Sequence, residues 1–190
     1  AAEAHLSKVA CDALSSTWPH IFQPIINLPA EFLHSWESLD TTSQAEKLGK
    51  VLVHGEIGCE SFVWGPAGEL EGVVGWGRAR LGSPAEDLSR LIASSLSPAA
   101  RRDSAEDRLA HYHTSLAAKL YPRPLPFSFQ EIHSAVQDLW LVGLTHALSS
   151  IASQLSRCQN KPDAVQALLD RAIALLTDCL DFVTRSQSSK

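Results

Sequence analysis

The side chains best suited to bind a metal in this chain are its eight histidines and four cysteines. His111 and His113 are two residues apart on a predicted helix, so their rings point in different directions and cannot chelate one ion together. The cysteines contain no C-x-x-C pair, which disfavours zinc. The sequence therefore predicts no metal site. Four other histidines are scattered along the chain and are better explained as surface or hydrogen-bonded core residues than as metal ligands: His20, His34, His133 and His146.

The cysteines lie at positions 11, 59, 158 and 179, an even number that allows two disulfides. Cys179 follows the predicted turn 159–162 by about 16 residues, roughly 24 Å along the next helix. Cys158 lies beside that turn, so antiparallel helices would hold these two thiols outside bonding range. Any disulfide must then pair each of them elsewhere. Four buried free thiols that act as small apolar side chains are the alternative.

Other chemistries find little support in the sequence. A Ser-His-Asp hydrolase would carry a G-x-S-x-G turn, and the chain has none. The chain has 16 basic and 21 acidic residues, a formal net charge of −5, and no basic stripe. Nucleic acid is therefore not an expected partner. The arginines that could bind other anions alternate with acidic residues, which indicates a solvated surface: Arg78, Arg80, Arg101 and Arg102.

Length and composition describe the chain that must position any site. Its 190 residues suit a single domain, residues 1–190, with a polar tail at 186–190. The 45% hydrophobic content excludes a disordered chain, and no apolar run reaches the roughly 18–20 residues that cross a membrane. The chain begins at Ala1 and contains no Met, so it is either processed or trimmed. Removal of a signal peptide would make an extracellular location as well supported as a cytoplasmic one.

Helical periodicity dominates the chain. Residues 6–14 and the segment from Phe32 toward Gly49 are predicted helices, joined by the Pro-rich connector 19–30. Runs at 61–64 and 70–74 flank a Gly-Pro-Ala-Gly turn and predict a hairpin. The fold class is therefore mainly α with a small β hairpin. Capping residues and prolines predict four further helices, over 83–96, 97–120, 128–158 and 162–183.

Residues 51–88 carry a recognisable frame of motifs. The frame reads Leu52-Val53-His54-Gly55, then Phe62-Val63-Trp64, then Gly72-Val73-Val74 and Trp76, and finally Gly82-Ser83-Pro84-Ala85-Glu86-Asp87-Leu88. It resembles the catalytic segment of the aminoglycoside phosphotransferase and choline-kinase-like superfamily, in particular the choline and ecdysteroid kinase-like proteins of nematodes and insects, of which the nematode type looks closest. The resemblance implies the C-terminal lobe of a protein-kinase-like fold, with the N-lobe absent.

The resemblance places three reactive positions, and all three differ in this chain. Phosphoryl transfer needs a carboxylate at the substrate hydroxyl, and an Asn and an Asp that hold magnesium against the phosphates. In this register the catalytic Asp is Glu56, the Asn is Ser61 and the metal-binding Asp is Gly75. Glu56 can still accept a proton, but Gly75 offers no ligand to a cation. We therefore expect no catalytic residue, no metal, no cofactor and no binding of ATP with magnesium.

Two further positions are implied to support the scaffold. In the family, the Asp that matches Asp87 accepts hydrogen bonds from the backbone of the His-Gly-Asp loop, and the residue that matches His54 supports the same loop. The nucleotide-covering lobe should supply a G-x-G-x-x-G loop, and the chain has none, since Gly72, Gly75 and Gly77 have the reverse spacing. A retained scaffold without its chemistry predicts a pseudokinase-like fold used for binding, not an enzyme.

Aromatic residues gather around the former active site: Phe62, Trp64 and Trp76 in the hairpin region, with Trp36 upstream. Packing in the core is the simpler interpretation. Alternatively, the missing lobe uncovers an apolar face that requires a cover, either a small apolar ligand or a second copy of the chain. We expect a binding protein that holds a small hydrophobic ligand in or near the former cleft. The alternatives are an oligomeric or regulatory interaction protein, and a residual small-molecule phosphotransferase with Glu56 as base.

Overall fold

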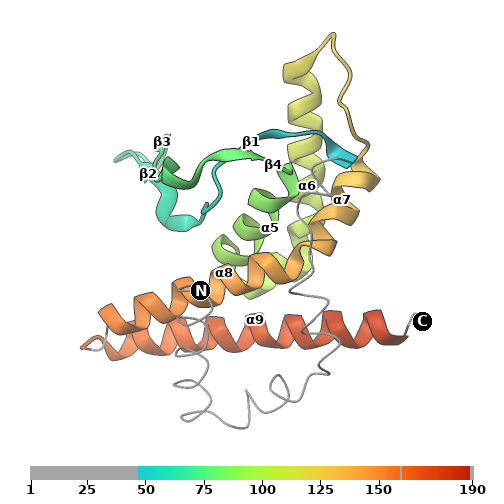
Figure 1. Ribbon diagram of the computed structural model, residues 1–190. Coiled ribbons are helices and arrows are strands. Elements are labelled where there is room, and N and C mark those ends of the chain that lie inside the picture. Colours follow the sequence, from blue (N-terminus) through green and yellow to red (C-terminus); the bar gives the residue numbers. More distant parts are fainter. Residues whose placement is uncertain (1–46, 159, 189–190) are drawn as a thin grey trace. The chain divides into compact units, whose positions relative to one another are not determined.

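The computed structural model describes residues 47–158 and 160–188 (Figure 1). The described residues divide into two compact units, one that ends at His146 and one that begins at Ala147; the first is called the 40–146 unit below. The predicted helix at 6–14 and the connector 19–30 lie outside the described residues, as does most of the second predicted helix, of which Lys47 and Leu48 are described as helical. Whether residues 1–190 act as a single domain stays a prediction.

The described strands form two short antiparallel pairs (Figure 1). Strand β2 (Phe62–Trp64) pairs with β3 (Leu70–Val73), which confirms the predicted hairpin. Its turn closes through a hydrogen bond of 2.8 Å from the Gly65 amide to the Glu69 carbonyl. Strand β1 (Val51–Val53) pairs with β4 (Arg80–Gly82), and the register sets Leu52 opposite Leu81. Strand β4 was not predicted, because three residues are too few to show a two-residue period.

The helices of the 40–146 unit begin where the sequence places their caps. Helix α5 (Pro84–Ser95) starts at Ser83, whose hydroxyl accepts a hydrogen bond from the Ala85 amide. Helix α6 (Pro98–Leu120) starts at Ser97, and α7 (Phe129–Asp138) starts at Ser128. Each cap satisfies an amide that the first helical turn leaves without a partner. The mainly helical fold with small antiparallel strand pairs is thus confirmed.

The prediction of one helix over 128–158 is wrong, because the chain bends at Leu139 between α7 and α8 (Trp140–Arg157). Leu139 adopts φ −92° and ψ 7°, outside the helical region, and its side chain is fully buried. No Pro or Gly marks this bend in the sequence. The bend follows from packing, since Gly143 in the next turn lies directly against the backbone of α5.

The core of the 40–146 unit joins α5, α6 and α7 with the residues that precede β1. Apolar side chains at helical spacing supply it, so burial of one face of each helix holds the unit together. These contacts fix α5, the helix that carries Asp87. The buried cluster is made of Leu48, Ala85, Leu109, Phe127, Ile132, Ala135, Val136 and Leu139.

The second unit contains the C-terminal part of α8 and the whole of α9 (Pro162–Ser188). Helix α9 begins at the proline that the sequence indicates, and it buries Ala172, Leu175 and Leu176. Within the described part of the chain, no helix combines the length and the apolarity needed to cross a membrane.

Candidate functional site

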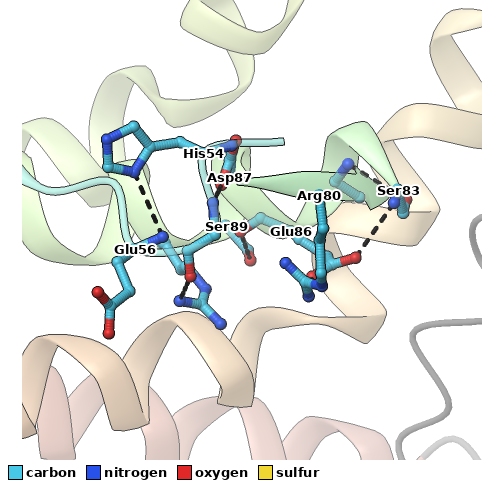
Figure 2. Close-up of polar contacts among 10 residues, drawn as sticks. His54, Glu56, Arg80, Ser83, Glu86, Asp87 and Ser89 are labelled. Carbon is cyan, nitrogen blue, oxygen red and sulfur yellow. Dashed lines mark hydrogen bonds and ion pairs between the residues drawn. The ribbon is translucent and has the colours of Figure 1, made fainter. Parts of the chain in front are cut away.

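The turn His54-Gly55-Glu56 follows β1 and is held by the first two turns of α5 (Figure 2). The Asp87 carboxylate accepts a hydrogen bond of 2.5 Å from the His54 amide and another of 3.0 Å from the Gly55 amide. Arg90, one turn later on α5, donates to the Gly55 carbonyl oxygen. Side chains of one helix thus form hydrogen bonds with both the amide and the carbonyl of Gly55. The contact proposed for Asp87 from the family resemblance is present in the structure.

The start of α5 is itself fixed by a buried carboxylate. Glu86 is 2% exposed, and one of its oxygens accepts a hydrogen bond of 3.1 Å from the Ser83 amide. Its other oxygen pairs with the Arg80 guanidinium from β4 (Figure 2). A buried charge is stable in a protein when it is paired and hydrogen-bonded, as Glu86 is. The capping box therefore joins β4 to α5 and sets the position of Asp87.

His54 is 2% exposed and links the turn to the residues after β3. Its Nε2 lies 2.8 Å from the Val74 carbonyl oxygen, and its Nδ1 accepts from the Glu56 amide at 3.3 Å. A ring that donates from Nε2 and accepts at Nδ1 is a neutral imidazole. The Trp76 ring lies against it, with a centroid distance of 4.8 Å. His54 thus joins the turn to the backbone after β3, while the scaffold role that the family resemblance implies for it stays a prediction.

The three altered positions have structural contacts of their own. The Glu56 carboxylate forms an ion pair of 2.8 Å with Arg78, and both side chains are about half exposed. Ser61 is 6% exposed, and its hydroxyl accepts a hydrogen bond of 3.2 Å from the Gly58 amide. Gly75 has a left-handed backbone with φ 89°, and a Cβ there would lie 3.5 Å from the His54 Cε1 atom. The structure brings the three positions around the same turn and hairpin.

The aromatic candidates lie on the hairpin and just after it. Trp64 is 60% exposed and Trp76 is 47% exposed, so the interpretation of these tryptophans as core residues is wrong. Phe62 is partly buried and lies beside Trp64, with ring centroids 6.2 Å apart. The hairpin is small, and two short strands offer little area in which large side chains can be buried. Trp36 lies outside the described residues.

Sequence reasoning missed Arg90 at this site, and it explained His146 as a scattered surface or hydrogen-bonded core residue. Burial lowers the pKa of Arg90 from its ordinary value, and it also lowers the pKa of His146. The positive charge of Arg90 lowers the pKa of His146 further, while the carboxylates of Glu60, Glu56 and Asp87 act in the opposite direction. The spacing Asp87-x-x-Arg90 was the available signal, because residues three apart share a helix face.

The predicted surface arginines are not all solvated. Arg101 is 5% exposed and donates to the Leu96 carbonyl at 3.1 Å. Arg80 and Arg78 hold Glu86 and Glu56. An arginine can be buried when its guanidinium finds acceptors, and the sequence pattern of alternating charges does not reveal those acceptors.

Among the described residues, the histidines and cysteines form no metal-binding cluster. His113 lies near the Phe127 carbonyl and His133 near Gln137, while His20 and His34 fall outside the described residues. Cys59 and Cys158 are free thiols, and Cys59 is exposed. Among residues 47–158 and 160–188, no group of three potential ligands from His, Cys, Asp and Glu is placed to hold a metal ion.

Comparison with known families gives one match. The model of the family DUF1679, described as "Uncharacterized oxidoreductase dhs-27", matches residues 9–187. The chain therefore belongs to this family. Searches among curated proteins and among solved structures gave no match.

Proposed function

We propose that this chain is a non-catalytic, pseudokinase-like binding protein that holds a small apolar ligand on the aromatic surface around the former active-site turn. The observation that carries the proposal is the pairing of an intact scaffold with occupied or missing reactive positions. Asp87 and His54 form hydrogen bonds that hold the turn, and Arg90 adds another at the Gly55 carbonyl oxygen. Of the positions that would act in phosphoryl transfer, Glu56 is engaged by Arg78 and Gly75 has no side chain.

The relationship to choline and ecdysteroid kinase-like proteins is part of this proposal. It is supported by the motif frame and by the order along the chain of the elements whose contacts hold the turn. A carboxylate at the second turn of α5 binds the backbone of a His-Gly-acidic turn after a short strand, and a hairpin follows that turn. In such a lobe the metal ligands come from Asn and Asp positions. Here Ser61 is buried against Gly58, and Gly75 lacks a carboxylate.

The family description uses the word oxidoreductase. An enzyme that binds a nicotinamide cofactor through a Rossmann unit carries G-x-G-x-x-G between a strand and a helix. The chain contains no such spacing of glycines. The contacts of the site therefore support the binding proposal better than a dehydrogenase of that type.

The proposed ligand surface is formed by Phe62, Trp64 and Trp76. It is apolar, and one of its polar ring atoms already has a hydrogen-bond partner. The indole Nε1 of Trp76 already donates to the Val73 carbonyl at 2.8 Å, so its exposed part is carbon. Trp64 pairs across the hairpin with Leu70, which is 51% exposed. Among the described residues, the exposed large hydrophobic side chains all lie in the segment from Leu52 to Leu81, with the single exception of Tyr121. Exposed apolar residues gathered in this way mark an interaction site.

A first prediction concerns the nucleotide. We expect the melting temperature of the chain to stay unchanged when ATP and magnesium are added at millimolar concentration, because a ligand stabilises only a native state that binds it. Differential scanning fluorimetry with ATP alone and with magnesium alone provides the controls. A saturable rise in melting temperature that requires both components would overturn the non-catalytic reading and favour the residual phosphotransferase.

A second prediction concerns the tryptophans. The neutral probe N-phenyl-1-naphthylamine should bind saturably, and W64A and W76A should each weaken its binding about tenfold, since loss of an aromatic contact of roughly 1.4 kcal/mol changes affinity by that factor. The matched control is Y121A, which removes an aromatic side chain that is 84% exposed and lies outside the hairpin. Equal effects of all three substitutions, or none, would argue against this surface.

Self-association is the second candidate function, and a separate observation favours it. Leu52 and Leu81 face each other across the β1–β4 pair and are 65% and 69% exposed. Apolar side chains exposed on a short sheet are suited to a symmetric contact with a second copy. Sedimentation equilibrium separates the candidates: a reversible dimer that excludes the probe favours self-association, whereas a monomer that binds the probe favours the ligand.

A further inference from the structure

A close helix contact directs His146 toward the residues that hold the Gly55–Glu56 turn. Gly143 lies so near α5 that a Cβ on it would be 2.4 Å from the Ser89 carbonyl oxygen and 3.1 Å from the Arg90 nitrogen. His146 follows Gly143 by three residues on α8, so it lies on the same helix face. His146 therefore lies on the face of α8 that meets α5, and the charge of Arg90 acts on its imidazole.

Two buried nitrogens at this place have no hydrogen-bond partner among the described residues: Nε of Arg90 and Nε2 of His146. The Arg90 guanidinium does form one hydrogen bond, because another of its nitrogens donates to the Gly55 carbonyl oxygen. Buried polar atoms without a partner are rare, and each lost hydrogen bond is unfavourable. The site is therefore sensitive to any change in the charge of the imidazole.

The charged groups that act on His146 come from three parts of the unit. Arg90 and Asp87 lie on α5, Glu60 lies in the short turn Cys59–Ser61, and Glu56 follows β1. Burial lowers the pKa of His146 below its usual value of 6.5, and the charge of Arg90 contributes in the same direction, although the three carboxylates oppose it. The imidazole is thus neutral at neutral pH, and a proton added to it creates a second, partly buried cation that the charge of Arg90 opposes.

We propose that His146 is a proton-sensitive residue that controls how firmly α5 holds the Gly55–Glu56 turn. With a neutral imidazole, Arg90 remains on the Gly55 carbonyl. Protonation of His146 repels the guanidinium, and the contact that yields is the hydrogen bond from Arg90 to Gly55. This inference concerns regulation of the turn and stands independently of the ligand proposed above.

The direction of the pH dependence follows from linkage. Because the pKa of His146 is lower in the folded chain than in the unfolded chain, its contribution to stability is present above about pH 6.5 and is lost as the pH falls through the lowered value. The turn should therefore loosen on the acid side of neutrality and be firmly held at and above pH 7.

Hydrogen exchange of the Gly55 and Glu56 amides, followed by NMR, tests the proposal. Between pH 7.5 and 5.5 we expect the protection factors of both amides to fall by up to about tenfold in the unsubstituted chain, because pH 5.5 lies about one unit below the ordinary pKa of histidine. H146Q, which cannot be protonated, should keep them constant. H111Q, which replaces an exposed histidine on α6, should behave like the unsubstituted chain.

The proposal is overturned if protection in H146Q falls as much as in the unsubstituted chain. It is equally overturned if NMR titration of the His146 ring gives a pKa at or above the ordinary histidine value. The ring titration uses the unsubstituted chain, so it decides the matter even if H146Q does not fold. Neither measurement involves the apolar probe, and a failure of ligand binding would leave this test intact.

Discussion

Replacing Asp87 with alanine should lower the free energy of unfolding by about 3 kcal/mol, because two backbone amides would lose a charged acceptor at once. The His54 and Gly55 amides both donate to this carboxylate, at 2.5 Å and 3.0 Å. Urea denaturation followed by circular dichroism measures the change.

D107A is the matched control for the Asp87 substitution, since Asp107 is an exposed aspartate on α6. A surface substitution of this kind changes stability by no more than about 0.5 kcal/mol. D87N keeps the size of the side chain and one carbonyl acceptor, so its loss should fall between those of D87A and D107A. If D87A were as stable as D107A, the turn would not depend on α5.

Replacing Gly143 with alanine should destabilise the chain by about 2 kcal/mol, although the same change inside an ordinary helix is stabilising by roughly 1 kcal/mol. The added methyl group would meet the Ser89 carbonyl oxygen at 2.4 Å, and this oxygen belongs to helical backbone that cannot move aside cheaply. The sign of the effect is therefore the diagnostic feature. Thermal and urea denaturation of G143A both report it.

Two controls accompany the Gly143 substitution. G143S introduces a Cβ at the same place and should be destabilising as well, whereas S149A, on an exposed position of the same helix, should be neutral or slightly stabilising. A stabilised G143A would mean that α8 does not approach α5 closely, and the direction of His146 toward Arg90 would then lose its support.

The fold was largely predictable because its signals are local. Ser83, Ser97 and Ser128 begin helices through hydrogen bonds to amides within the first turn, and such short-range patterns are visible in the sequence. The glycine turn between β2 and β3 is local in the same sense. The bend at Leu139 was not predictable, because its cause is a contact between Gly143 and Ser89, far apart in the sequence.

The residues of the candidate site also fall into those that local spacing predicts and those that depend on contacts between distant parts of the chain. Glu56, Ser61, Gly75 and Asp87 were identified from a motif frame in which spacing carries the information. The pairing of Glu56 with Arg78 and the exposure of Trp64 depend on how the hairpin folds back, so the sequence did not reveal them. His146 was weighed as one of several scattered histidines, because nothing in its own neighbourhood along the chain indicates its place beside Arg90.

The backbone at Gly75 has an evolutionary consequence under the proposed descent from a metal-binding phosphotransferase. Its φ of 89° is a conformation that residues other than glycine adopt only with strain. A single codon change to aspartate would therefore return the carboxyl group but place it on a backbone shaped for glycine, next to His54. Reversion would therefore require a change in the backbone path of the hairpin as well as a new side chain.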